Sequence, residues 1–430
     1  MIHRTISEWE VIKHDPDLDN EKTIPDEAAS RIAATAAAFS LSGLSGRRVL
    51  EHRRDGLRAR GVVGLIAAEG CSLEILPKID IHDSDTTEEN VKIRQRLIYM
   101  LEVALDIRID VGMITELEWQ KETLLEVLIR AFSEKLIEAV RKGVPRRYIE
   151  QEDDLPMLRG SLNVTRQFTV HAANPSHLAC RFNTLSEDIA INQIMKAAVT
   201  LLRRHAQTFD NQRRLRELEF AYSDIAEVPV AALRRNKPII NRTNERWRDL
   251  FNLAWFLLEH CFQTTTSGKG RGFSLLFEMN TLFERYVTRL AIRALSGTNM
   301  IVVPQGGLKF CLIKEPDKGL FQTKPDILIE YDDEVIHIVD TKWKRISKQI
   351  DDSKQGISQG DVYQMMAYGQ VYQCRKLTLL YPHHGGLGED EGVHSSYRVA
   401  KQEARLRFAT FDVAKDKKIV ERLHQLLRWQ

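Results

Sequence analysis

Residues 324 to 344 read KPDILIEYDDEVIHIVDTKWK, and this stretch decides the fold of the last third of the chain. It has the pattern of a β-hairpin, because two β-branched, apolar runs of strand length flank the turn-rich sequence YDDE. With a three-residue loop, 332–334, antiparallel pairing would set Asp326 opposite Asp340, with the two side chains about 5 Å apart on one face. Lys342 lies two residues beyond Asp340 and would project from that same face.

Two carboxylates and an ammonium group at the end of a strand are costly to bring together unless their charge is compensated. A divalent cation would compensate it, and Mg²⁺ or Mn²⁺ prefers carboxylate oxygens as ligands. Such an ion activates water and stabilises charge on a phosphorus centre, while a lysine orients the nucleophile or neutralises the developing charge. The alternative is a solvated hairpin with an Asp–Lys surface pair, because a chain of this length contains the bare pattern by chance with a probability on the order of one in six.

Composition limits the class of protein. A chain of 430 residues with 43% hydrophobic and 28% charged residues is typical of a soluble protein of two or three domains. The net charge of +2 includes 62 basic residues, so any nucleic-acid surface would be a local patch. Five scattered cysteines without CxxC spacing argue against a disulfide framework and against structural zinc. The sequence shows no signal-peptide pattern and no apolar run long enough to span a membrane, so we expect a cytoplasmic protein.

The order of patterns predicts an α+β, multidomain chain with three parts. Residues 1–85 are expected to form a β-rich module with a helix at 28–39, and residues 86–265 a mainly helical middle region with an extended excursion. Residues 266–430 are expected to form a mixed sheet flanked by helices. The linkers between these parts are predicted at 81–90 and 263–272. Helices of the middle region are expected at 91–105, 116–141, 189–204, with Ser186 and Asp188 as N-caps, and 244–262.

The expected elements of the C-terminal part follow a definite order. A helix, 274–295, carries Glu278 and Glu284 and precedes two strands and the hairpin. The further elements are strands at 300–304 and 308–313, a helix at 360–372, strands at 377–382 and 406–413, and a closing helix at 415–427.

The helix after the Asp-x-Lys strand adds a second motif. Gln364 and Tyr368 are spaced QxxxY, one helical turn apart on one face. Together with Pro-Asp and Asp-x-Lys in this order, they resemble the QxxxY branch of the PD-(D/E)xK nucleases. In that branch an acidic residue on the preceding helix completes the metal site, and Glu284 matches it. Glu278 lies six residues earlier, about 240° round the helix, so both glutamates cannot point at one metal.

Further landmarks occur in one order over most of the chain: LEILPKI (73–79), LRGSL (158–162), CRFNTLSED (180–188), FERYV (283–287) and LLYP (379–382). With them the chain resembles the McrC family, the nuclease subunits of McrBC-type modification-dependent restriction systems. The resemblance implies an Mg²⁺-dependent DNA endonuclease of antiviral defence with a PD-(D/E)xK domain in its last third. It also implies an AAA+ partner, McrB, that hydrolyses GTP and recognises methylcytosine in double-stranded DNA. The absence of a GxxxxGK[ST] loop from this chain agrees with that division of labour.

The resemblance also implies the roles of individual residues. Asp326 and Asp340 would bind the metal, with Glu284 as a further ligand, directly or through water, and the backbone carbonyl of Thr341 beside them. Lys342 would position or activate the attacking water. The two motif residues that would orient this lysine and the substrate phosphate are Gln364 and Tyr368.

The resemblance implies that the N-terminal half docks on the partner ring, stimulates its GTPase and contributes a projection into its pore. We hypothesise that the basic stretch holding Arg47, Arg48, Arg53 and Arg54 belongs to this projection, the alternative being a solvated hairpin. One site cuts one strand, so a double-strand break would need two copies. Two other functions remain open: a RecB-like exonuclease component, and a non-catalytic regulator of an AAA+ ring.

Overall fold

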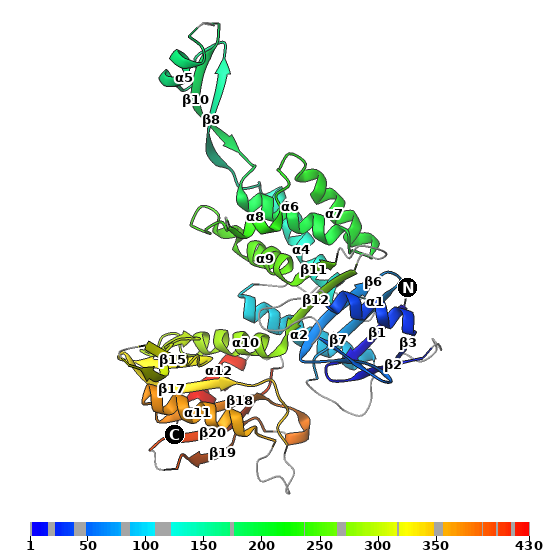
Figure 1. The fold of residues 1–430 in the computed structure, drawn as a ribbon, viewed down its shortest axis with the longest axis vertical. Coiled ribbons are helices and arrows are strands. Elements are labelled where there is room, and N and C mark those ends of the chain that lie inside the picture. The colour runs from blue at the N-terminus through cyan, green and yellow to red at the C-terminus, as the bar shows by residue number, and fades with distance from the viewer. Residues whose placement is uncertain are drawn as a thin grey trace. The chain divides into compact units, whose positions relative to one another are not determined.

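The computed structural model describes residues 2–15, 22–37, 49–78, 87–107, 122–172, 176–235, 237–264, 272–315, 318–347, 356–388, 390–400, 403–413 and 418–429. Its fold is α+β, and its contacts divide the chain into two compact units (Figure 1). The first unit combines residues 1–127 with residues 260–430, and the second comprises residues 128–259. Both ends of the chain therefore build the first unit, and the division at residues 259–260 lies close to the boundary predicted near residue 265.

A five-stranded sheet of the first unit joins these two ends. Its order is β1-β7-β6-β12-β11, with bounds Ile2–Ser7, Cys71–Leu76, Val62–Ala68, Gly272–Glu278 and Cys261–Thr264. A four-stranded sheet, β3-β2-β5-β4, lies beside it, with bounds Thr23–Ile24, Val11–His14, Gly56–Ala59 and Leu50–Arg53. Helix α1, Asp26–Ala37, packs Ile32 and the alanines at 28, 29, 33 and 36 into the core that these strands share. The described residues of the N-terminal part are thus β-rich with one helix, as the sequence predicts.

Strand β12 corrects two expectations. The first five residues of the helix expected at 274–295 belong to strand β12, and helix α10 begins only at Met279 and ends at Ala294. Strand β12 pairs with β6 and β11, so the predicted linker, 263–272, contains the ends of two paired strands. The run FSLLF has no period that distinguishes a strand from a buried helix, and its partner β6 lies some two hundred residues earlier.

A six-stranded mixed sheet forms the C-terminal part of the first unit. Its order is β13-β16-β17-β18-β20-β19, with bounds Ile301–Pro304, Ile327–Tyr331, Glu334–Thr341, Lys376–Pro382, Arg405–Phe411 and Gly392–Arg398. Strands β17, β18 and β20 run parallel, and helix α11, Gln359–Tyr372, connects the first two. The remaining elements are helix α12, Ile419–Leu427, the 3-10 turn η3, Gly385–Leu387, and a separate hairpin of β14, Phe310–Lys314, and β15, Lys318–Gln322.

The two faces of this sheet are covered by different helices. Met365 and Tyr368 of α11 pack on one face, in a core with Leu328 and Ile338. Helices α10 and α12 pack against each other, and the Tyr286 hydroxyl of α10 donates to the carbonyl of Val413 beyond β20 at 3.4 Å. Asp326 and Asp340 have the strand parity of Leu328 and Ile338, so both carboxylates belong to the face that α11 covers.

The central hairpin has the predicted register but not the predicted loop. Ile327 pairs with Val339, which carries Asp326 opposite Asp340. Tyr331 pairs with Glu334, so the turn is the two residues 332–333, and a bulge next to Ile329 shifts the pairing by one residue. The two-residue turn and the bulge together have the same effect on the register as a three-residue loop.

The second unit has a helical body and a long β-hairpin. The body contains α4 from Leu124 to Arg141, α6, Ala190–Arg203, α7, Phe209–Ala221, α8, Val230–Arg235, the 3-10 turn η2, Glu245–Trp247, and α9, Arg248–His260. The helix expected at 244–262 is therefore a 3-10 turn followed by α9, and residues 261–264 form β11. The residue before α6 is Ile189, which provides no side-chain cap. The predicted caps were wrong: Ser186 accepts from the Asp188 amide, and Asp188 accepts from Gln193 and Ala226.

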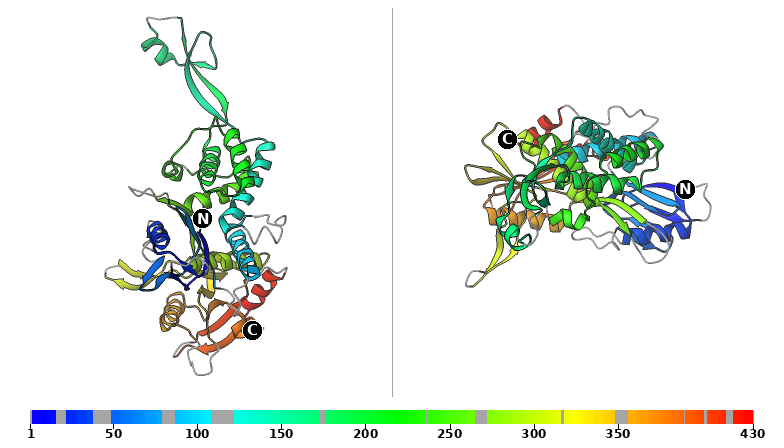
Figure 2. Two further views of the ribbon diagram at one scale, coloured as in Figure 1. Left: turned by 90° about the vertical axis from the view of Figure 1, so that its right-hand side faces the viewer. Right: turned by 90° about the horizontal axis from the view of Figure 1, so that it is seen from above.

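The extended excursion predicted in this region is an arm, residues 147–186. Strands β8, Arg147–Leu155, and β10, Leu178–Ser186, pair over their full length. Strand β9, Ser161–Leu162, and helix α5, Val164–Thr169, complete the far end. In Figures 1 and 2 the arm extends away from the helices of its own unit.

Helix α2, Thr87–Leu105, belongs to the first unit, where it packs against α10. A buried ion pair fixes it to the N-terminal sheet, because Arg94 contacts Glu74 of β7 at 2.5 Å. The same carboxylate accepts from the Leu124 amide at 3.1 Å. None of the described helices combines the length and the apolar character that crossing a membrane requires.

Candidate active site

The ends of β16 and β17 bring two carboxylates together under α11. The Asp340 side chain is only 1% exposed, and its Oδ2 lies 2.6 Å from the ammonium nitrogen of Lys342. Asp326 Oδ2 accepts two hydrogen bonds, from the backbone amide and the hydroxyl of Thr341, both at 2.8 Å. The sequence prediction missed this use of Thr341, which orients Asp326 through its amide and hydroxyl.

Burial raises the pKa of both aspartates, and the charge of Asp326 raises that of Asp340 further. Burial, followed by the charge of Asp326, raises the pKa of Asp340 to about 7, although Lys342 acts in the opposite direction. Burial also raises the pKa of Asp326, against the two hydrogen bonds from Thr341. Perturbed carboxyl groups of this kind are frequent at functional sites.

Lys342 remains a cation in this setting. Burial by itself would lower its pKa, but the neighbouring Asp340 and Asp326 outweigh that effect and the pKa is raised. Its ammonium group also donates to Gln364 Oε1 at 3.2 Å. The site therefore holds a fixed positive charge beside its two aspartates.

The QxxxY pair extends this network. Gln364 Nε2 donates to the Tyr368 hydroxyl at 2.7 Å, and that hydroxyl donates to the carbonyl of Lys324 at 3.2 Å. Burial, and then the charge of Asp340, raise the pKa of Tyr368 to about 12, so this phenol stays protonated near neutral pH. The helical spacing predicted from the sequence thus connects Lys342 to the segment before Asp326.

Glu284 reaches the site from α10. Burial raises its pKa, and repulsion from the charge of Asp326 acts in the same direction. Gln305, which follows β13, donates to Glu284 Oε1 at 2.5 Å, and its backbone amide donates to the carbonyl of Asp326 at 2.9 Å. Glu278 instead immediately precedes α10 and accepts from the Thr281 hydroxyl. Gln305 was not predicted, and only the pair of glycines after it marks a tight loop in the sequence.

The segment after Lys342 is held by distant residues that the sequence did not reveal. The Trp343 indole donates to Glu8 Oε1 at 2.6 Å, and its amide donates to Asn280 Oδ1 at 3.1 Å. Lys344 pairs with Asp361 of α11 at 2.8 Å.

The donor set fits a hard divalent cation, although no ready-made cluster of three His, Cys, Asp or Glu side chains occurs within the described ranges. Asp340 Oδ2 is buried and, in the part of the chain that the structure describes, has no hydrogen-bond donor of good geometry; its charge is balanced by the Lys342 ammonium. Asp326 raises the pKa of both Asp340 and Glu284. A cation among these oxygens would relieve that repulsion.

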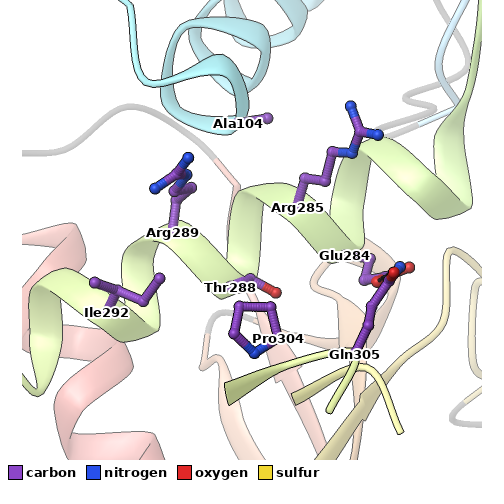
Figure 3. Close-up of a pocket in the computed structure, with 8 residues that line it drawn as sticks. All are labelled: Ala104, Glu284, Arg285, Thr288, Arg289, Ile292, Pro304 and Gln305. Atoms are coloured by element: carbon purple, nitrogen blue, oxygen red, sulfur yellow. Dashed lines mark hydrogen bonds between the residues drawn. The ribbon is translucent and has the colours of Figure 1, made fainter. Parts of the chain in front are cut away.

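A pocket of about 380 Å³ lies next to this site along α10 (Figure 3). Glu284 and Gln305 line it, together with the side chains Ala104, Arg285, Thr288, Arg289, Ile292 and Pro304. The carboxylate of Glu284 is thus shared between the cluster of acidic residues and this pocket.

Comparisons with known proteins agree with the resemblance seen in the sequence. A family model described as "McrBC 5-methylcytosine restriction system component" matches residues 57–382. The search of curated proteins found no significant match. A solved assembly of Thermococcus gammatolerans McrB AAA+ hexamers with bound McrC contains a similar chain, with a TM-score of 0.68 and 21% identity over 99% of both chains. A second structure, the McrBC complex of the same organism, matches 68% of this chain and 88% of that one, with a TM-score of 0.51 and 24% identity.

Proposed function

Because the chain belongs to the family of McrBC 5-methylcytosine restriction system components, we propose that it is the nuclease subunit of such a system. It would hydrolyse phosphodiesters of DNA that contains modified cytosine, in concert with a GTP-hydrolysing AAA+ partner. The observation that carries this proposal is the convergence of Asp326, Asp340 and Lys342 at the ends of adjacent strands. A cytoplasmic location is part of the same proposal, and the free thiols of Cys71, Cys180, Cys311 and Cys374 agree with it.

Mg²⁺, or Mn²⁺, would be held by Asp326 and Asp340, with Glu284 and the carbonyl of Thr341 as further donors. When bound, such an ion supplies positive charge to the phosphate and favours ionisation of water. The chain's own residues prepare the site: Thr341 fixes the rotamer of Asp326, and Gln305 fixes Glu284. The proposed ligands are therefore oriented in advance.

Lys342 would act as a cation rather than as a base. Its raised pKa keeps the ammonium protonated near neutral pH, so it would orient the attacking water and balance charge on the phosphate. Gln364 and Tyr368 hold the lysine through one chain of hydrogen bonds. This role requires no proton transfer to Lys342.

Substituting these residues tests the nuclease assignment. Asp340→Ala and Lys342→Ala should each lower plasmid cleavage at least about a hundredfold, because each removes charge that the reaction uses. Glu334→Ala, at the exposed start of the same strand, is the matched control and should cleave normally. Binding to the AAA+ partner and GTPase stimulation should survive in all three variants; their joint loss would indicate a structural role.

The substrates used in the same assay separate the alternatives. Methylated and unmethylated plasmids would be incubated with the chain, with and without its AAA+ partner, in GTP or ATP. Cleavage that needs methylation, partner and GTP together supports the proposal. Degradation from DNA ends without GTP would favour a RecB-like exonuclease, and GTPase stimulation without cleavage in any metal would favour a non-catalytic regulator.

We propose further that the arm, 147–186, is the part that enters the partner ring. A solved assembly with a chain similar to this one contains McrC bound to McrB AAA+ hexamers. A long projection such as the arm could enter the central pore of such a ring. The arm exposes large apolar side chains near its far end, including Met157 at 76% and Phe168 at 72%. Ion pairs stabilise the far end of the arm; one of them joins the Arg166 guanidinium to Asp154 Oδ2 at 2.7 Å.

The basic stretch remains a second candidate for this contact. Arg47 and Arg48 lie outside the described residues. Arg53 ends β4 and Arg54 lies in the short turn to β5, on a hairpin far shorter than the arm. The earlier hypothesis about these arginines therefore stays a prediction.

Deleting the arm tests whether the arm or the basic stretch contacts the partner ring. Arg147 pairs with Ser186, so residues 148–185 can be replaced by a short Gly-Ser turn without moving the ends of the body. We expect stimulation of the partner's GTPase to be lost while the first unit keeps its stability. Charge reversal at Arg47, Arg48, Arg53 and Arg54 is the comparison: loss of stimulation there, with normal stimulation after arm deletion, would assign the contact to the basic stretch.

A double-strand break would require two copies of the site. We therefore expect the complete complex to contain at least two copies of this chain during cleavage, which sedimentation analysis of the complex with DNA can measure. A single copy that linearises plasmid in one binding event would contradict this.

A further inference from the structure

Two arginines of α10 line the pocket beside the acidic cluster. Arg285 and Arg289 are four residues apart, so their side chains lie one helical turn apart on the same side of α10. Figure 3 shows both guanidinium groups on the side of α10 toward Ala104 of α2, and Glu284 with Gln305 on the other side of this helix; all of them line the same pocket. The pocket therefore connects two cations to a proposed metal ligand.

Both arginines are exposed, and within the described ranges neither forms an ion pair or a hydrogen bond. Arg293, one turn further along the same helix, differs in this respect because it pairs with Asp106 at 2.9 Å. Arg285 and Arg289 are thus free to meet an anion, whereas Arg293 already has a carboxylate. A third cation, Lys324, is exposed and close enough to Glu284 and Asp326 to lower the pKa of both.

An acidic site that acts on a polyanion needs cations beside it. Asp326, Asp340 and Glu284 would repel a DNA strand, and Lys342 is already paired with Asp340. A guanidinium group presents a planar fork of donors that matches two oxygens of a phosphate. The pocket offers two such forks: Arg285 is near enough to Glu284 to lower the pKa of that carboxyl group, but neither guanidinium forms an ion pair within the described ranges.

We propose that Arg285 and Arg289 bind backbone phosphates of the DNA strand next to the bond that is cut. This inference rests on the proposed nuclease function, because it assumes that the phosphodiester that is cut lies at the acidic cluster. The two arginines hold the strand along α10 through its phosphates. They are sequence-independent contacts and leave base recognition to other surfaces.

The test measures DNA binding by the full-length chain without turnover. A fluorescein-labelled duplex of about 30 base pairs would be titrated in Ca²⁺ over a range of salt concentrations, the length covering a site of ordinary size. Arg285→Ala with Arg289→Ala should weaken binding roughly tenfold or more, and should lower the salt slope by about 1 per arginine. The double lysine variant should keep the slope, because a lysine retains the charge.

Arg293→Ala is the matched control on the same helix and should bind DNA as the wild type does. Equal affinity and equal salt slope for the wild type and the double alanine variant would overturn the inference. The inference would also be overturned if the double alanine variant bound DNA normally but no longer bound the protein partner. The two arginines would then contact an acidic segment of that partner. Absence of nuclease activity would refute the proposed function and leave this binding result standing, so the two failures are distinguishable.

Discussion

At the scale of single residues, the contact between Glu8 and Trp343 shows how a distant side chain supports the site. Glu8 is 3% exposed, and its Oε1 accepts from the indole of Trp343, which follows Lys342. Its Oε2 is buried and has no hydrogen-bond partner among the described residues. Burial raises the pKa of Glu8 to about 7, although the hydrogen bond from Trp343 acts against this. Glu8 is therefore protonated in the folded protein at mildly acidic pH.

This pKa predicts how the free energy of unfolding depends on pH. Between about pH 4.5 and pH 7 the folded state binds more protons at Glu8 than the unfolded state, so stability falls as the pH rises. Glu8→Gln keeps an acceptor for Trp343 and removes the contribution of Glu8 to this pH dependence. Between pH 4.5 and pH 7 that contribution changes the free energy of unfolding by about 3 kcal/mol. Urea unfolding of both proteins at pH 5 and pH 8 measures the difference. The exposed Glu69→Gln should show the wild-type pH dependence, and a Glu8→Gln protein that also does so would contradict the assignment.

At the scale of elements, the turn of the central hairpin holds two aspartates in a strained backbone conformation. Asp332 and Asp333 both have positive φ, 50° and 62°, in a two-residue turn. Such turns favour glycine because L-residues are strained at positive φ. The aspartates are tolerated because the paired strands on either side fix the turn and the bulge next to Ile329 sets the register.

The turn predicts opposite effects at two neighbouring positions. Asp333→Gly should raise the free energy of unfolding by about 0.5 kcal/mol, because it relieves positive-φ strain, and it should leave cleavage unchanged. Glu334→Gly, one residue later at the start of β17, should lower the free energy of unfolding, since glycine weakens a strand. Thermal unfolding of the two variants measures both changes. Destabilisation by Asp333→Gly as well would mean that this turn is not of the two-residue type.

At the scale of the whole molecule, the first unit depends on pairing between residues far apart in sequence. Strand β12 lies between β6 and β11 and leads directly into α10, which carries Glu284. Gly64 of β6 has φ +129°, and a Cβ there would lie 2.0 Å from the carbonyl oxygen of Leu275 in β12. The approach of the two strands therefore requires glycine at this position.

Substituting Gly64 tests whether this pairing holds the unit together. Gly64→Ala should cost at least about 3 kcal/mol of unfolding free energy, because it forces β6 and β12 apart and strains the backbone. Gly70→Ala is the control: its φ is also positive, +75°, but its Cβ would meet no heavy atom within 4 Å, so only about 1 kcal/mol of strain is expected. Equal stability losses for the two variants, measured by urea unfolding, would show that the β6–β12 approach is not tight.

The sequence by itself was sufficient for the features that depend on local patterns. The hairpin, its register, the helix carrying Gln364 and Tyr368, and the family resemblance were all readable, since strand alternation and helical spacing are properties of neighbouring residues. The hairpin pattern predicted Asp326, Asp340 and Lys342, and the resemblance predicted Glu284; in the structure Asp326 acts electrostatically on both Asp340 and Glu284, and Lys342 acts on Asp340.

Only the tertiary structure decided which distant segments meet. The strand character of FSLLF, the attachment of Trp343 to Glu8, and the bonds that orient Glu284 through Gln305 follow from contacts across long sequence separations. An apolar run is equally suited to a strand or a helix until its neighbour is known, and a polar side chain does not reveal its partner. For this protein, local spacing determined the chemistry of the candidate site, and non-local packing determined how that chemistry is held in place.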